Sequence, residues 1–176
     1  MNPSAHLRWL VIGYGNGLRE DDGAGPAAAA AVEALGLHGV GVTVCHQLTP
    51  ELSGSLAAVD CAVFLDATAA EPPGVGVRVS AIGAGMAPGW TGHLASPESL
   101  LALTELLHAR RPRAWCLAIP GERFGWGSGL SETARQGVDA AVNQVRTLHE
   151  AWGVSPMDGA IHEAGVKEGD PCTRPA

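Results

Sequence analysis

Short apolar runs alternate along most of this chain with longer segments of helical period. This alternation is typical of an α/β domain, in which helices cover both faces of a mostly parallel sheet. The predicted strands are residues 7–13, 40–47, 61–68, 77–82 and 113–121. Two helices are predicted at residues 26–35 and at 130–152, the second with Ser131 as its N-cap. A short helix within 49–60 is expected to begin with Thr49 and Pro50, and another is expected to begin at Ser96 and Pro97, with apolar positions Leu100, Leu103, Leu106 and Leu107. Residues 77–82 follow the third strand too closely for a helical crossover, so we expect this strand to run antiparallel to the others.

The length and composition favour one folded domain. The chain has 176 residues, of which 46% are hydrophobic and 16% charged, which is enough to form a sizeable core. We expect residues 1–152 to form a single α/β domain, a three-layer α/β/α sandwich around a mostly parallel five-stranded sheet with one antiparallel strand. Residues 153–176 are polar and turn-rich without periodicity, which predicts a poorly ordered tail.

Charge and cysteine usage exclude several classes of partner and compartment. The net charge is −7 and there is no basic stripe, so nucleic acids and anionic membranes are poor partners. No apolar run reaches about 18 residues, and the short apolar N-terminal run leads straight into a glycine turn, so we expect neither a membrane span nor a secretory signal. None of the four cysteines belongs to a C-x-x-C pair, and three of them lie in apolar strands. This pattern favours a reduced, cytoplasmic protein.

The first strand leads into the turn Gly13-Tyr14-Gly15-Asn16-Gly17-Leu18, at the sheet edge where open α/β folds bind ligands. A dinucleotide fingerprint requires glycine where Leu18 stands, and a P-loop requires a lysine that this segment lacks. The next acids, at residues 20–22, would repel a phosphate. The turn is therefore a poor nucleotide site.

Carboxylates before a helix commonly cap its free N–H groups, and this is our first interpretation of Glu20 and Asp21. Asp22 differs because it is expected to meet Asp66, an aspartate that ends an otherwise apolar strand. Asp66 could also simply form a turn. With His93, which precedes the Ser96 helix start, the two aspartates would form a ligand set suited to a divalent transition metal. His46, at the end of the second strand, competes for the imidazole position.

Conventional hydrolytic nucleophiles are scarce. There is no G-x-S-x-G elbow and no H-E-x-x-H motif, and the strand cysteines lack the electropositive setting of a reactive thiolate.

The block VIGYGNGLREDDGAGPAAAAAVEAL closely resembles the opening of the nickel-iron hydrogenase maturation endopeptidases, whose first strand ends in a G-x-G-N turn followed by an acidic pair and G-x-G. The resemblance continues through QLTPELSGSLAAVDCAVFLDAT, HLASPESLLAL, LAIPG and GLSETARQGVDAAVNQV, and it spans roughly residues 8–150.

The resemblance implies a phosphorylase/hydrolase-like fold and an aspartyl-type endopeptidase. Such an enzyme removes the C-terminal extension from the precursor of the hydrogenase large subunit after nickel insertion. The implied catalytic and metal-sensing residues are Asp22, Asp66 and His93, and the implied cofactor is nickel carried by the substrate.

Two alternatives remain open. The three side chains could hold a resident zinc ion as in a conventional zinc-dependent peptidase or amidohydrolase, since three protein ligands plus water form an ordinary catalytic zinc site. The chain could also be a non-enzymatic, Rossmann-like binding module that recognises a ligand at the glycine turn.

Overall fold

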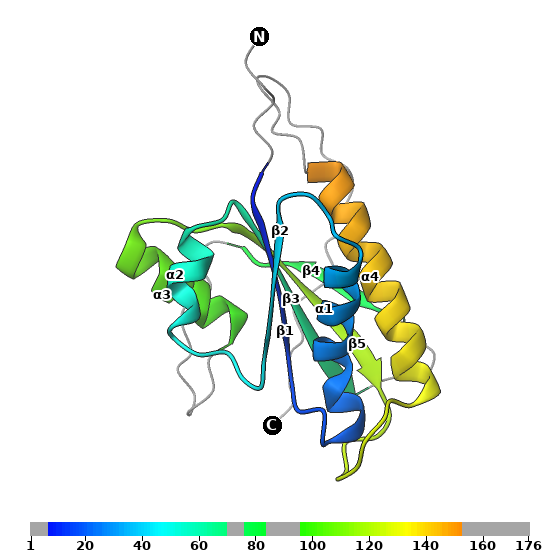
Figure 1. Cartoon of the computed structure of the whole chain (residues 1–176). Coiled ribbons are helices and arrows are strands. Elements are labelled where there is room, and N and C mark those ends of the chain that lie inside the picture. The colour runs from blue at the N-terminus through cyan, green and yellow to red at the C-terminus, as the bar shows by residue number, and fades with distance from the viewer. Residues whose placement is uncertain (1–6, 70–75, 84–95, 153–176) are drawn as a thin grey trace, which may run out of the picture.

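The computed structural model describes residues 7–69, 76–83 and 96–152 (Figure 1). The elements in chain order are β1 (Trp9–Tyr14), η1 (Glu20–Gly23), α1 (Ala24–Ala34), β2 (Val40–Cys45), α2 (Leu52–Ala57), β3 (Cys61–Ala69), β4 (Arg78–Ala81), α3 (Pro97–His108), β5 (Arg113–Gly121) and α4 (Glu132–Trp152). Within these ranges, no helix combines the length and the hydrophobicity that a membrane span requires.

The strands form one sheet in the order β2-β1-β3-β5-β4, in which only β4 runs antiparallel. The predicted fold class is therefore confirmed. Although β4 follows β3 along the chain, its neighbour is β5, which pairs with β3 over nine positions from Cys61↔Arg113 to Ala69↔Gly121. The largely apolar β5 takes the inner position, whereas all four residues of β4 are exposed at the edge.

Helices cover both faces of the sheet, with α1 and α4 on one side and α2 and α3 on the other (Figure 1). Alternate strand residues supply two separate cores. Trp9, Val11 and Leu65 pack toward α1 and α4, whereas Ile12 and Phe64 belong to the core under α2 and α3. The strands thus bury both faces, as near-continuous apolar strands of a parallel sheet do.

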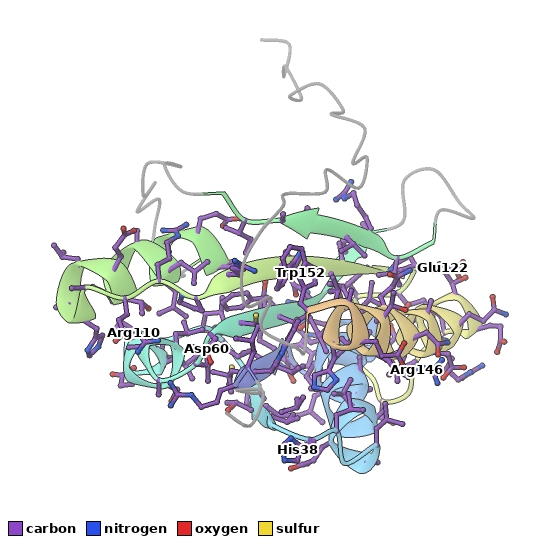
Figure 2. The ribbon with its side chains drawn as sticks, turned by 90° about the horizontal axis from the view of Figure 1, so that it is seen from above. His38, Asp60, Arg110, Glu122, Arg146 and Trp152 are labelled. Carbon is purple, nitrogen blue, oxygen red and sulfur yellow. The ribbon has the colours of Figure 1, made fainter. Side chains whose placement is uncertain are left out.

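Two contacts stabilise the amino end of this layered structure, one on each face of the sheet. At the amino edge of the sheet, Asp60 accepts a hydrogen bond from the backbone N–H of Arg8 and forms an ion pair with Arg110 at 3.5 Å (Figure 2). On the other face, Trp152 at the end of α4 lies beside β5, with its ring 6.0 Å from that of Trp115. Both contacts lie far from the carboxyl ends of β1 and β3.

Helix α1 begins in close contact with the carboxyl ends of β1 and β3. A Cβ atom on Gly25 would lie closer than 3.0 Å to the carbonyl oxygens of Tyr14 and Leu65. These oxygens belong to rigid backbone, so no larger residue fits at position 25 without displacing the helix. This close approach fixes the turn before α1 at the sheet edge.

Several predicted boundaries and faces need correction. Helix α2 begins at Leu52 rather than at Thr49 and Pro50. The carbonyls of Thr49 and Pro50 accept i→i+3 hydrogen bonds, of the turn type, from the N–H groups of Leu52 and Ser53. Strand β3 continues for three residues past Asp66 and ends at Ala69.

The apolar stripe of α3 also differs from the predicted one. Leu106 and Leu107 are exposed, whereas Leu101 and Thr104 are buried beside Leu100. The contact stripe is rotated by one position and ends before the last turn. The predicted helix caps are present, because Ser96 accepts from the N–H of Ser99 and Ser131 accepts from that of Ala134. The predicted tail, residues 153–176, lies outside the described residues.

Candidate active site

A pocket of about 240 Å³ opens at the carboxyl edge of the sheet. Its walls come from the end of β1, the segment after β2, the middle of β3 and the turn before α1. The lining residues are Tyr14, Gly15, Asp22, His46, Gln47, Leu48 and Asp66. The structure therefore brings Asp22 and Asp66, predicted from separate segments, to one cavity.

The glycine turn after β1 shapes the position of Asp22. Gly15 has φ of +140°, and a Cβ atom there would collide with the carbonyl oxygen of Asp22, so the two backbone segments are in direct contact. The Asp22 carboxylate accepts a hydrogen bond from the backbone N–H of Asn16 through Oδ2 at 2.9 Å. This bond helps to orient the carboxylate at the pocket wall.

Asp66 has a different environment, because it projects from the interior of β3. Burial raises the pKa of Asp66, and the negative charge of Asp22 raises it further, whereas the Tyr14 hydroxyl and the Ala67 N–H act in the opposite direction as hydrogen-bond donors. Burial dominates. A carboxylate held in this way gains from the approach of a cation, which would offset both its desolvation and its repulsion from Asp22.

Tyr14 is the site residue that the sequence did not reveal. Burial and the charge of Asp66 raise the pKa of Tyr14 well above its ordinary value, so its hydroxyl stays protonated and donates to Asp66. The signal was present in the alternation of β1, since Tyr14 shares a face with Leu10 and Ile12.

The imidazole position remains open between two residues. His46 is exposed and lines the pocket with both aspartates, directly after β2. His93 lies outside the described residues. Within the described ranges, no three His, Cys, Asp or Glu side chains are grouped closely enough to hold a metal ion.

The strand thiols are poor nucleophiles. Burial, followed by the charges of Asp66 and Glu98, raises the pKa of Cys116 to about 11. Burial also raises the pKa of Cys61 to about 11 and that of Cys45 above its ordinary value. At neutral pH these cysteines are protonated, as expected from their apolar strands.

Asp21, next to Asp22, faces away from the pocket and is fully buried. Its carboxylate accepts four hydrogen bonds from the loop between β5 and α4, residues 122–131. The donors are the N–H groups of Glu122 at 2.7 Å, Arg123 at 2.9 Å and Ser131 at 2.6 Å, and the Ser131 hydroxyl at 2.7 Å.

The acids before α1 therefore do not cap their own helix, which corrects the capping interpretation of Glu20 and Asp21. Neither η1 nor α1 has a side-chain cap. Glu20 accepts from the N–H of Gly125 at 3.2 Å, so both carboxylates fasten the same distant loop. Burial alone would raise the pKa of Asp21, but the hydrogen bonds from Ser131, Glu122 and Arg123 outweigh it and lower the pKa.

Solved structures give a consistent likeness. The nickel-iron hydrogenase maturation protease HybD from Thermococcus kodakarensis superposes with a TM-score of 0.65 at 23% identity, over 81% of this chain and 99% of that protein. The hydrogenase maturating endopeptidase HybD from E. coli gives a TM-score of 0.66 at 22% identity, over 84% and 95% of the two chains. This chain has the hydrogenase maturation protease fold.

A third solved structure shows the same likeness. The hydrogenase 2 maturation peptidase from Thaumarchaeota archaeon SCGC_AB-539-E09 has a TM-score of 0.59 at 23% identity, over 83% of this chain and 98% of that one. No family model matches the sequence, and no curated protein gives a significant match. The maturation protease fold is thus evident from the tertiary structure.

Proposed function

We propose that this chain is an endopeptidase that removes the C-terminal extension from the large-subunit precursor of a nickel-iron hydrogenase after nickel insertion. The observation that carries the proposal is the pairing of Asp22 and Asp66 in one pocket of a hydrogenase maturation protease fold. The resemblance of the segment from Val11 to Leu35 to the opening of these enzymes supports it. We place the reaction in the cytoplasm because the sequence favours a reduced compartment.

In this proposal the nickel belongs to the substrate. Asp22, Asp66 and one imidazole contact the ion when the precursor binds, and the ion polarises the scissile carbonyl or activates a water molecule. A pocket carboxylate then acts as the general base. Tyr14 donates to Asp66 and so fixes the orientation of that carboxylate.

Selectivity for nickel must come from the substrate. Two carboxylates and one imidazole form a modest ligand set, and on the Irving–Williams order copper would bind there more tightly than nickel. Cysteine thiolates of the precursor would hold the nickel and present it to the pocket.

The test is cleavage of purified precursor with and without nickel. Nickel-loaded precursor should be cut, nickel-free precursor should resist cleavage even with free zinc present, and prior chelation of the enzyme alone should have little effect. Efficient cleavage of nickel-free precursor would refute the nickel requirement. Inactivation by chelating the enzyme alone would instead favour a resident zinc ion.

The same assay distinguishes the two histidines. We expect His93→Ala to abolish processing and His46→Ala to retain most of it. The reverse result would assign the imidazole role to His46, which the pocket already contains.

A further inference from the structure

Two loops that are far apart in the sequence run side by side, and one of them contains the pocket residue Asp22. The turn before α1 and the loop between β5 and α4 form a short parallel bridge between Arg19 and Gly127. The N–H of Gly127 donates to the carbonyl of Leu18 at 3.0 Å, and the N–H of Glu20 donates to the carbonyl of Gly127 at 3.1 Å. This register places Leu18 opposite Trp126, and paired residues of parallel segments project to the same side.

These two side chains are strongly exposed. Trp126 is 83% exposed and Leu18 is 65% exposed, so neither contributes to a core. A tryptophan in water has a large apolar surface that folding has left uncovered. Single exposed apolar residues are common, but an adjacent tryptophan and leucine beside a candidate active site form a patch of the type that binds other proteins.

The patch stands on a rigid base. The buried Asp21 carboxylate holds the 122–131 loop through four hydrogen bonds, and Glu20 accepts from the N–H of Gly125. A Cβ atom on Gly127 would lie 3.2 Å from Cγ of Glu20, so the acidic side chain packs directly against the glycine after Trp126. A surface fixed in advance loses little conformational entropy on binding.

Glu20 itself adopts a conformation that is unfavourable for its residue type. Its φ of +49° lies in the left-handed region, which is unfavourable for a residue other than glycine. The contacts of Glu20 with the 122–131 loop offset this cost. This strained turn fixes the backbone of Leu18 beside that of Trp126.

The patch lies in the same turn as one of the pocket acids and is flanked by two arginines. Leu18 precedes Asp22 by four residues in the same turn, so the patch and the pocket acids share one edge of the sheet. The exposed Arg19 and Arg123 flank the patch, and Arg123 forms an ion pair with Glu20 at 3.9 Å. Arg19 also donates to the carbonyl of Phe124 at 3.1 Å, which links this polar margin to the 122–131 loop. An apolar centre with a polar margin of this kind fits a protein partner that offers an apolar recess.

We propose that Leu18 and Trp126 form the docking surface for the folded body of the large-subunit precursor, while its C-terminal region reaches the pocket. This inference rests on the proposed function. A pocket of about 240 Å³ has room for no more than a short stretch of the substrate around the scissile bond. Binding energy from parts of the substrate remote from that bond must therefore supply much of the affinity, and this patch is the adjacent surface suited to it.

The test compares Trp126→Ala and Leu18→Ser with a matched control. Leu106→Ser is the control because Leu106 is 80% exposed but lies on α3, away from the patch. With nickel-loaded precursor, each patch variant should raise KM about tenfold or more, the size of effect expected for an interface hot spot, while kcat at saturation stays within about twofold. Leu106→Ser should match the wild type, and Trp126→Phe should restore most of the lost affinity.

Each other outcome has a defined meaning. If the wild type cleaves the precursor and both patch variants keep its KM, the docking surface is refuted and the proposed function stands. If the wild type does not cleave nickel-loaded precursor, the proposed function fails and the docking inference fails with it. Gel filtration adds a third arm: a wild-type dimer that Trp126→Ala converts to a monomer would assign the patch to self-association and overturn the proposed partner.

Discussion

Asp21 and Asp22 are neighbours in the sequence, yet their carboxylates lie in two different kinds of environment. Asp21 is fully buried and accepts four hydrogen bonds from the 122–131 loop. Asp22 faces a pocket, where the one hydrogen bond to its carboxylate comes, within the described residues, from the N–H of Asn16. Asp66 shares that pocket and is destabilised as an anion by burial and by Asp22.

The difference separates a structural carboxylate from carboxylates that are available for chemistry. The lone pairs of Asp21 are occupied, so it can neither bind a cation nor accept a proton without breaking the contacts between two loops. The pocket aspartates keep unused acceptor capacity, at a cost in stability that a substrate cation would offset. The comparison predicts stability effects of opposite sign for the two regions.

The largest effect is expected for Asp21→Asn. The new amide would place its NH₂ group against backbone N–H donors and would leave buried groups unpaired, which costs on the order of 2–4 kcal/mol. For a chain of this size the thermal midpoint should fall by roughly 5–15 °C. Thermal unfolding of the variant, with the exposed Asp139→Asn as control, measures this. An unchanged midpoint would show that the four hydrogen bonds contribute no net stability.

The pH dependence of unfolding should identify the ionised form of Asp21 as the stabilising one. The pKa of Asp21 is lowered in the folded state. Its contribution to the free energy of unfolding is therefore fully present above the pKa of about 3.9 in the unfolded chain, and it is lost as pH falls through the folded-state pKa. Urea unfolding between pH 7 and pH 3 should show a steeper loss for the wild type than for Asp21→Asn. Parallel curves for the two proteins would contradict this assignment.

Asp66→Asn should instead stabilise the protein, by about 0.5–2 kcal/mol at neutral pH, as substitutions at functional sites often do. The pKa of Asp66 is raised in the folded state, so its ionisation disfavours folding at pH values above that pKa and the cost disappears as pH falls. The stability gain should therefore be larger at pH 8 than at pH 4, while precursor processing is lost. A destabilised variant would show that the hydrogen bond from Tyr14 outweighs burial.

Asp22→Asn should have the smallest effect on stability. The Asn side-chain oxygen can still accept from the N–H of Asn16, and the site is partly open to solvent, so the change in free energy should stay within about 0.5 kcal/mol. The thermal midpoint should move by a few degrees at most, whereas precursor processing should stop. Retained processing would remove Asp22 from the active site.

The sequence predicted more of the fold than of the site. Alternating apolar runs were enough to locate all five strands, since burial on both faces of a parallel sheet leaves a strong local pattern. The close spacing of 77–82 to the previous strand correctly predicted its antiparallel direction, but not its pairing with β5. Strand order depends on which surfaces pack best across the whole sheet, and that information is not local.

The candidate site divides in the same way. The sequence by itself determined that Asp22 and Asp66 would reach the carboxyl edge, because strand direction fixes which end of a strand meets the ligand-binding edge. Three features were decided only by the tertiary structure. They are the hydrogen bond from the Tyr14 hydroxyl to Asp66, the presence of His46 in the pocket, and the contacts of Asp21 with a loop 101–110 residues away. Hydrogen bonds between distant segments have no periodic signature, since each depends on how two separately formed elements come together in space.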